Sequence, residues 1–199
     1  WLFGRKKNMQ VYGPEGTEEF MNHFEQAFDW DLRYRYLTNV HVEGSDLITT
    51  DIEPGVFYNK NGIKITAFDV AHLPMDPDTE ELLGLEGATF GYRVDYKGRS
   101  VVFSGDTRSL PGSKIIEISK GVDVLVHETQ IPYPGDSKEA KLANVSMIVH
   151  SSPEQVAYVF NETRPRLGIY HHIIPPETTR DELLGMTDYD GRMEVAEDL

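Results

Sequence analysis

The chain has 199 residues and a formal net charge of −14, with 33 Asp and Glu against 19 Lys and Arg, and it contains no Cys. Its 39% hydrophobic and 26% charged residues are typical of a globular protein and exclude a disordered one. The absence of Cys excludes disulfides, thiolate metal sites and a cysteine nucleophile, and it leaves the compartment, cytoplasm or periplasm, undecided. The acidic balance disfavours a broad nucleic-acid surface, and no apolar run approaches the roughly 20 residues of a membrane helix.

The first half of the chain predicts a strand, a helix and two hairpins. Met9–Tyr12 is typical of a strand, and residues 17–28 carry apolar residues at helical spacing, which we expect to lie in the core. That apolar face is formed by Phe20, Met21, Phe24, Ala27 and Phe28. The turn pairs Asn61-Gly62 and Lys97-Gly98 predict the hairpins. Their strands are 56–58 with 63–70, and 90–96 with 100–103. The acidic stretch 76–86 between them predicts an exposed loop.

The second half predicts helices alternating with strands. The apolar run 122–126 is typical of a strand buried on both faces. Ser152 and Gln155 form a predicted capping box at the start of a helix that begins with Pro153. The other expected elements are helices at 113–120 and 181–186 and strands at 166–170 and 192–196. The fold class is therefore α/β (α+β), with sheets covered by helices, in a single domain over residues 1–199.

Polar residues follow four of the predicted strands. They are His72, Asp106, the pair His127 and Glu128, and the pair His171 and His172. If these strands run in the same direction, their side chains converge at one edge of the sheet. Imidazole and carboxylate ligands suit zinc and similar divalent ions. We expect His127 to point into the core or bond the backbone, and His171 to support the site or be structural.

An ordered set of short motifs carries a family resemblance. The motifs are Val11-Tyr12-Gly13-Pro14, Asp69-Val70-Ala71-His72, Phe90-Gly91-Tyr92-Arg93-Val94, Ser104-Gly105-Asp106-Thr107, Val124-Leu125-Val126-His127-Glu128-Thr129, His150-Ser151-Ser152-Pro153-Glu154-Gln155-Val156-Ala157 and Ile169-Tyr170-His171-His172. Each motif is weak alone, but the order resembles the metallo-β-lactamase-fold hydrolases, in the branch of ribonuclease Z and the metal-dependent arylsulfatases. The resemblance extends from about Met9 to Leu199.

This resemblance implies an αββα sandwich with two divalent metal ions at the sheet edge, zinc first, with manganese or iron as alternatives. It implies that His72 binds one metal, that Asp106 bridges both, and that His172 is the last histidine ligand. His150 corresponds to a residue that contacts the substrate or protonates the leaving group, and Glu128 to a carboxylate that orients His150. A metal-bridging hydroxide is the implied nucleophile, because bound metals lower the pKa of water to about 7.

The sequence departs from the family pattern in two places. The family's His-x-His-x-Asp-His motif, which belongs upstream of Met9, is absent from residues 1–199, so we expect the domain to be incomplete at its N-terminal side. With only three ligands, the chain alone is expected to bind metal poorly and to be inactive. The long Gly- and Pro-rich arm of many transfer-RNA-processing members is also missing, because Val94 connects to Ser100 through a tight hairpin.

These observations leave three hypotheses about function. The first is a metal-dependent hydrolase of small esters, arylsulfatase-like or phosphodiesterase-like. The first alternative is a ribonuclease Z-like endonuclease that processes transfer RNA 3′ ends, and the second is a non-catalytic remnant or binding subunit. The expected partner is a small-molecule ester, with RNA less favoured, no membrane and a homodimer left open.

Overall fold

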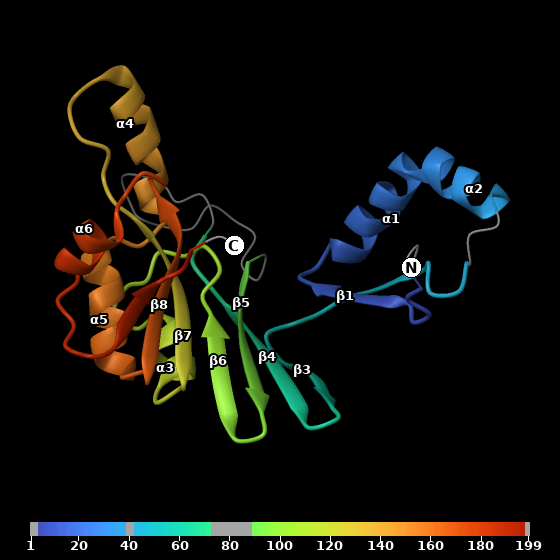
Figure 1. The fold of residues 1–199 in the computed structure, drawn as a ribbon, viewed down its shortest axis with the longest axis horizontal. Coiled ribbons are helices and arrows are strands. Elements are labelled where there is room, and N and C mark those ends of the chain that lie inside the picture. Colours follow the sequence, from blue (N-terminus) through green and yellow to red (C-terminus); the bar gives the residue numbers. More distant parts are fainter. Residues whose placement is uncertain (1–3, 39–41, 73–88, 198–199) are drawn as a thin grey trace. The chain divides into compact units, whose positions relative to one another are not determined.

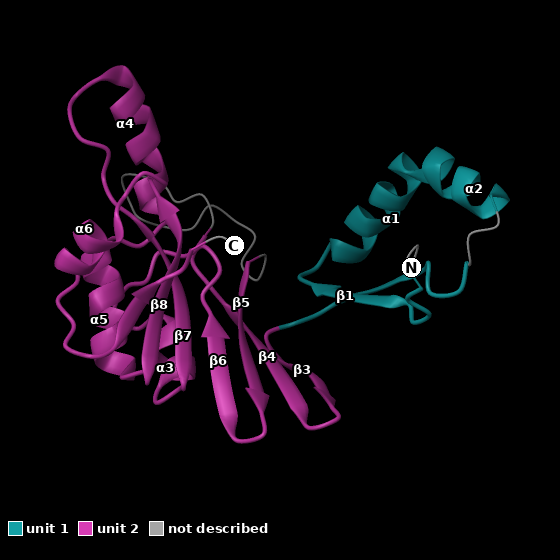
Figure 2. Cartoon of the chain, viewed as in Figure 1, with its two compact units in different colours: residues 1–53 teal, residues 54–199 magenta. Residues whose placement is uncertain are grey.

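The computed structural model describes residues 4–38, 42–72 and 89–197 (Figure 1). The chain divides into two compact units, residues 1–53 and residues 54–199 (Figure 2). The single domain expected over residues 1–199 stays a prediction. The acidic stretch 76–86 lies outside the described residues. Among the described residues, no helix combines the length and apolar character that crossing a bilayer requires.

The first unit contains two strands and two helices. Its elements are β1 (Met9–Gly13), α1 (Thr17–Ala27), α2 (Asp29–Leu37) and β2 (Leu47–Asp51). The two strands pair in parallel, with Met9 opposite Leu47. The carboxylate of Asp51 accepts hydrogen bonds from the backbone N–H groups of Gly16 at 2.9 Å and Glu18 at 2.8 Å. This carboxylate satisfies N–H groups at the start of α1, which have no partner inside the helix.

The aromatic face of α1 is not part of a core, contrary to the prediction. Phe20, Phe24 and Phe28 are 65%, 47% and 49% exposed, and α1 contains no buried residue. The physical reason is that a sheet of two five-residue strands is too small to cover a helix. The rings instead contact one another: Phe20 and Phe24 are stacked with centroids 6.5 Å apart, and Phe24 and Phe28 are tilted with centroids 4.9 Å apart.

The second unit is built on a seven-stranded sheet in sequence order. Its strands are β3 (Gly55–Lys60), β4 (Ile63–Asp69), β5 (Phe90–Tyr96), β6 (Arg99–Phe103), β7 (Val124–Gln130), β8 (Leu167–Ile174) and β9 (Met193–Val195). Pairing is antiparallel from β3 to β6 and parallel from β6 to β9. Consequently β4, β6, β7 and β8 all run in the same direction, as the predicted convergence requires, and their carboxyl ends meet at one edge (Figure 1).

Both predicted hairpin turns are confirmed. Asn61 and Gly62 have φ angles of 55° and 77°, and Lys97 and Gly98 have φ angles of 49° and 73°. Positive φ at both central residues defines the type I′ turn, whose twist matches that of the flanking strands.

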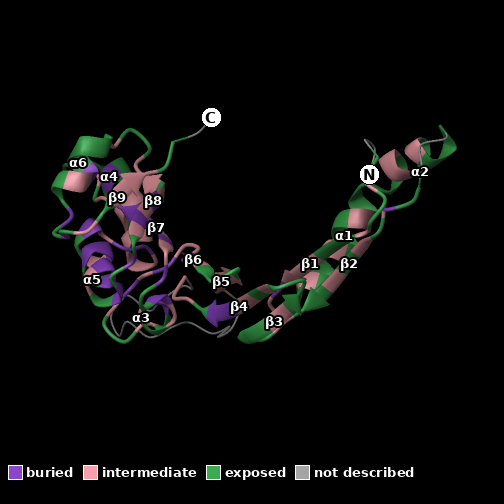
Figure 3. Ribbon diagram, turned by 60° about the horizontal axis from the view of Figure 1, so that its bottom comes forward, coloured by how far each residue is buried: buried purple, intermediate pink, exposed green. Residues whose placement is uncertain are grey.

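Helices cover one face of this sheet. They are α3 (Lys114–Ser119), α5 (Pro153–Thr163) and α6 (Arg180–Gly185). Phe160 and Val156 of α5 pack with Leu125 of β7 and Tyr170 of β8 in the main core. Figure 3 shows buried residues gathered in α5 and the strands next to it. The sequence did not predict α4 (Lys138–Asn144) or the 3₁₀ helix at Val145–Ile148. Both lie in the connection between β7 and α5.

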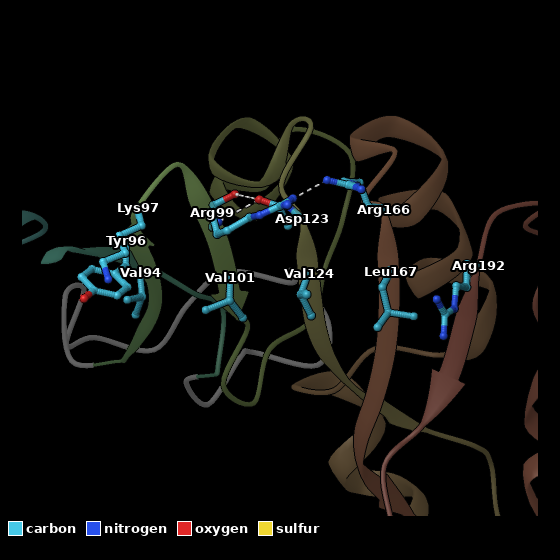
Figure 4. Close-up of a pocket in the computed structure, with 11 residues that line it drawn as sticks. Val94, Tyr96, Lys97, Arg99, Val101, Asp123, Val124, Arg166, Leu167 and Arg192 are labelled. Atoms are coloured by element: carbon cyan, nitrogen blue, oxygen red, sulfur yellow. Dashed lines mark hydrogen bonds and ion pairs between the residues drawn. The ribbon is translucent and has the colours of Figure 1, made fainter. Parts of the chain in front are cut away.

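The opposite face of the sheet is apolar and bears a hollow of about 650 Å³. The floor of the hollow is a row of side chains from four neighbouring strands (Figure 4). They are Val94, Val101, Val124 and Leu167. At its rim, Asp123 binds the guanidinium groups of Arg99 at 2.8 Å and Arg166 at 3.1 Å. In a two-sheet sandwich, such a face packs against the second sheet.

The capping box at the start of α5 is confirmed and gives a stability prediction. The Ser152 hydroxyl accepts from the Gln155 backbone N–H at 3.4 Å, and the Gln155 side chain accepts from the Ser152 N–H at 2.9 Å. Ser152→Ala removes the first bond and is expected to lower the free energy of unfolding by about 1 kcal/mol. Urea unfolding measures this change. Ser152→Asp keeps the acceptor and should stay close to wild type; an equal loss in both variants would contradict the capping role.

Candidate metal centre

Three predicted ligands converge at the carboxyl edge of the sheet. His72 follows β4, Asp106 follows β6, and His172 lies near the end of β8. The Oδ2 atom of Asp106 is 3.8 Å from the Nε2 atom of His72 and 3.4 Å from the Nε2 atom of His172. All three side chains are about one third to one half exposed, so the cluster is open to a ligand on one side.

A β-bulge aims His172 at this cluster. Pairing between β7 and β8 passes from Glu128 opposite His171 to Thr129 opposite Ile173, which leaves His172 as the extra residue. Its φ angle is 44°, a left-handed conformation in which His is among the more frequent non-glycine residues. A bulge redirects a side chain out of the regular alternation. The direction of His172 therefore depends on the bulge.

The strands β7 and β8 are longer than predicted, which corrects the placement of four residues. Pairing continues to Gln130 opposite Ile174, so the two strands contain the residues that the sequence placed just after them. These residues are His127, Glu128, His171 and His172. The added length arises from inter-strand hydrogen bonds. Local composition does not reveal such bonds.

Ser104 and Gly105, the two residues before Asp106, determine the shape of the loop that carries it. Gly105 has a φ angle of 62°, a conformation that glycine adopts without steric cost. The Ser104 hydroxyl donates to the Gly105 carbonyl at 2.6 Å and accepts from the Glu128 N–H at 3.2 Å. The turn after β6 is thereby attached to β7, and Asp106 is held at the edge of the sheet.

His150 and Glu128 form a buried pair beside the cluster. The Nδ1 atom of His150 lies 2.9 Å from the Oε2 atom of Glu128, whose side chain is fully buried. The ring centroid of His150 is 5.0 Å from that of His72 and 5.7 Å from that of His172. The structure therefore brings all five predicted site residues together. Among the described residues, the group whose ligand atoms all lie within 4.8 Å of one another is His72, Asp106 and His150, with His150 in place of His172.

Burial shifts the proton affinities of this pair in opposite directions. Desolvation raises the pKa of Glu128 to about 8, with a further increase from the negative charge of Asp106. Backbone N–H groups of Ser151 at 2.8 Å and Thr107 at 3.4 Å oppose the increase. Burial lowers the pKa of His150, and repulsion from His72 adds to the effect. The two groups therefore compete for one proton along the hydrogen bond that joins them.

His127 points into the core, as predicted. It is fully buried; its Nδ1 atom donates to the Glu128 carbonyl at 2.7 Å, and its Nε2 atom accepts from the Ser109 hydroxyl at 2.9 Å. A carbonyl can only accept, which fixes this tautomer. Both ring nitrogens are occupied, so His127 is not positioned to bind a metal.

Protonation of His127 should make the protein sensitive to acid. Burial lowers its pKa from 6.5 to about 4, so between these values the unfolded chain binds a proton that the folded chain does not. The resulting stability is fully present above pH 6.5 and is lost as pH falls to 4, by roughly 3 kcal/mol. Urea unfolding at pH 7 and pH 5 should show a smaller loss in His127→Gln, which hydrogen-bonds without titrating. Equal losses in both proteins would contradict this assignment.

His171 does not join the cluster of ligand atoms. Its Nε2 atom is buried and has no hydrogen-bond partner among the described residues, and burial lowers its pKa. A supporting or structural role for His171 stays a prediction.

The cluster fits a divalent metal ion. In a tetrahedral zinc site with bonds of 2.0–2.1 Å, neighbouring ligand atoms lie about 3.3 Å apart. The 3.4 Å and 3.8 Å separations from Asp106 to the two histidines are close to that value. Each histidine could therefore share an ion with the Asp106 carboxylate, and imidazole and carboxylate are both donors that zinc takes from proteins. Two ions that share Asp106 require further donors.

Sequence reasoning missed two residues that brace this centre, Thr107 and Ser151. Both lie inside motifs that the resemblance used, next to Asp106 and His150. Their roles depend on hydrogen bonds to residues about 40 positions away in the sequence, so no local pattern marks them.

The chain is similar to known proteins both in sequence and in fold. Residues 3–173 match the family model described as "Beta-lactamase superfamily domain". Ribonuclease Z of Mycobacterium tuberculosis (strain H37Rv) is 26% identical over 203 residues, covering 96% of this chain and 67% of that protein. Two solved structures share the fold. The metallo-β-lactamase-fold protein YhfI of Bacillus subtilis has a TM-score of 0.61 at 13% identity, with 97% of this chain and 63% of that chain covered. The short form of human tRNase Z has a TM-score of 0.59 at 16% identity, with 99% and 68% covered.

Proposed function

Because the chain belongs to the beta-lactamase superfamily, we propose that it provides the hydrolytic site of a metal-dependent phosphodiesterase that cleaves RNA, as a ribonuclease Z does. The observation that carries the proposal is the convergence of His72, Asp106 and His172 beside the His150–Glu128 pair. The relative with 26% identity, named ribonuclease Z, supports RNA as the substrate over a small sulfate ester.

In this proposal, one group of residues binds metal ions and another transfers a proton. His72, Asp106 and His172 would hold divalent ions, zinc first, with manganese or iron as alternatives. Bound ions would supply Lewis acidity and a water acidic enough to act as nucleophile near neutral pH. Glu128 holds the Nδ1 side of His150. The Nε2 side of His150 can therefore give a proton to the departing oxygen when the phosphorus–oxygen bond breaks.

Hydrolysis of a small ester, arylsulfatase-like or phosphodiesterase-like, is the second candidate function. One observation favours it: β5 and β6 are joined by the two-residue turn Lys97-Gly98, and no arm that could grip RNA is inserted there. The net charge of −14 also opposes broad contact with phosphates. A non-catalytic remnant or binding subunit is the remaining alternative.

Parallel assays with three substrates separate these functions. The full-length protein, loaded with zinc, is given a precursor transfer RNA with a 3′ trailer, bis(p-nitrophenyl) phosphate and p-nitrophenyl sulfate. We expect cleavage of the RNA that is removed by a chelator and weakened by salt, because phosphate contacts release counterions. Turnover of the sulfate ester alone would favour the second candidate. Loss of all three activities with zinc bound would favour the binding subunit.

A further inference from the structure

Ser151 connects three segments of the metal centre through its side chain and backbone. It is fully buried. Its hydroxyl donates to the Thr107 carbonyl at 2.6 Å and accepts from the Ser109 N–H at 2.9 Å. Its own N–H donates to Oε1 of Glu128 at 2.8 Å. Its carbonyl accepts from the Gln130 N–H at 2.8 Å. One serine therefore links the Asp106 loop and the end of β7 to the segment that carries His150.

Thr107 extends this connection to the segment that carries His72. The Thr107 hydroxyl accepts from the Ala71 N–H at 3.1 Å. The Arg108 N–H in turn donates to the Ala71 carbonyl at 2.8 Å. The residue before His72 is thus bonded on both its polar backbone groups to the loop that follows Asp106. Hydrogen bonds run without interruption from Ser151 through Thr107 to Ala71.

We propose that Ser151 is a positioning residue that sets the spacing of the metal ligands by fixing the Asp106 loop. It touches neither the ligand atoms nor the open side of the centre, so it acts through Thr107 and Ser109. The inference rests on the proposed function, because it assumes that Asp106 and His72 bind metal. Removing a residue that hydrogen-bonds to metal ligands, and so orients them, commonly lowers metal affinity by about 10- to 100-fold.

Removal of the hydroxyl should loosen the loop rather than unfold the protein. In Ser151→Ala, the Thr107 carbonyl and the Ser109 N–H lose a buried partner, and an unpaired buried group is costly. Movement of the Asp106 loop toward other partners relieves this cost. That movement changes the separations of 3.4 Å and 3.8 Å between Asp106 and the two histidines.

The test compares Ser151→Ala with a matched buried hydroxyl elsewhere. Thr187 is buried, and its hydroxyl also makes two hydrogen bonds, to the Tyr170 hydroxyl at 2.8 Å and the Leu183 carbonyl at 2.9 Å. Zinc affinity is measured in the full-length protein by competition with a chromophoric chelator, alongside urea unfolding. We expect both Ser151→Ala and Thr187→Ala to lower stability, and only Ser151→Ala to weaken zinc binding, by about 10- to 100-fold.

A second pair of variants covers the case in which Ser151→Ala does not fold. Thr107→Val keeps the shape of the side chain but cannot accept from the Ala71 N–H, so it should weaken zinc binding in the same range, and Thr107→Ser should restore it. Unchanged zinc affinity in Ser151→Ala or Thr107→Val would overturn the positioning role, as would an equal loss in Thr187→Ala. A wild-type protein that binds no zinc would instead overturn the proposed function, and the inference with it.

Discussion

Asp106→Ala is expected to abolish hydrolysis, with turnover at least about 1,000-fold below wild type. The carboxylate of Asp106 is the one negative charge among the three proposed ligands, and it faces both histidine Nε2 atoms, at 3.8 Å and 3.4 Å. Its loss removes the negative charge that would help these residues to hold divalent ions. Metal catalysis is worth several kcal/mol of transition-state stabilisation, and each 1.4 kcal/mol is about tenfold in rate. Steady-state turnover of the preferred phosphodiester measures the loss.

Two further variants make this result specific. Asp106→Asn keeps the shape of the side chain but not its charge, and should lose nearly as much activity as Asp106→Ala. Asp136→Ala removes a carboxylate whose side chain is almost fully exposed, and should retain wild-type turnover. Undiminished turnover in Asp106→Ala, with folding verified by circular dichroism, would sink the assignment of the metal centre.

His150→Ala should lower kcat by about 100- to 10,000-fold while zinc content stays the same, because general acid catalysis contributes in that range. The hydrogen bond from its Nδ1 atom to Glu128 at 2.9 Å orients the ring for proton transfer. Glu128→Gln should lower kcat less than His150→Ala, because the ring loses its carboxylate partner but remains in place. Turnover and bound zinc are measured on the same preparations.

The leaving group provides an internal control for the role of His150. A p-nitrophenolate leaving group departs without a proton, so His150→Ala should slow bis(p-nitrophenyl) phosphate much less than RNA. The competing possibility is that His150 binds metal, since its ligand atom lies within 4.8 Å of those of His72 and Asp106. Loss of zinc from His150→Ala, with equal slowing of both substrates, would show a ligand rather than an acid.

The family and the fold class were predictable because they depend on the order of short motifs and of helices and strands along the chain. The motifs occur in the family's order, and the match over residues 3–173 confirms the resemblance. The mixed sheet with helices on one face confirms the α/β (α+β) class, and the shared fold with YhfI confirms the metallo-β-lactamase type. Both hairpins followed from Asn61-Gly62 and Lys97-Gly98, because the turn chemistry is local.

Features that depend on pairing between distant segments were not predictable. The bulge that leaves His172 without a paired residue on β7 arises from the register of β8 against β7. No residue near His172 encodes that register. The exposure of Phe20 and its neighbours on α1 likewise depends on what covers the helix, whereas helical periodicity shows only that the face is apolar. The role of Ser151 depends on contacts with Thr107 and Ser109 across the fold.

Anomalous diffraction at the zinc absorption edge, from crystals of the protein grown with zinc, would show directly whether Asp106 and the histidines beside it bind a metal ion. We expect a peak about 2.0–2.2 Å from the carboxylate of Asp106 and from at least one of the Nε2 atoms of His72 and His172. His150 should still be bonded to Glu128 through Nδ1. Strong peaks elsewhere on the protein, with none at Asp106, would contradict the assignment of the metal centre.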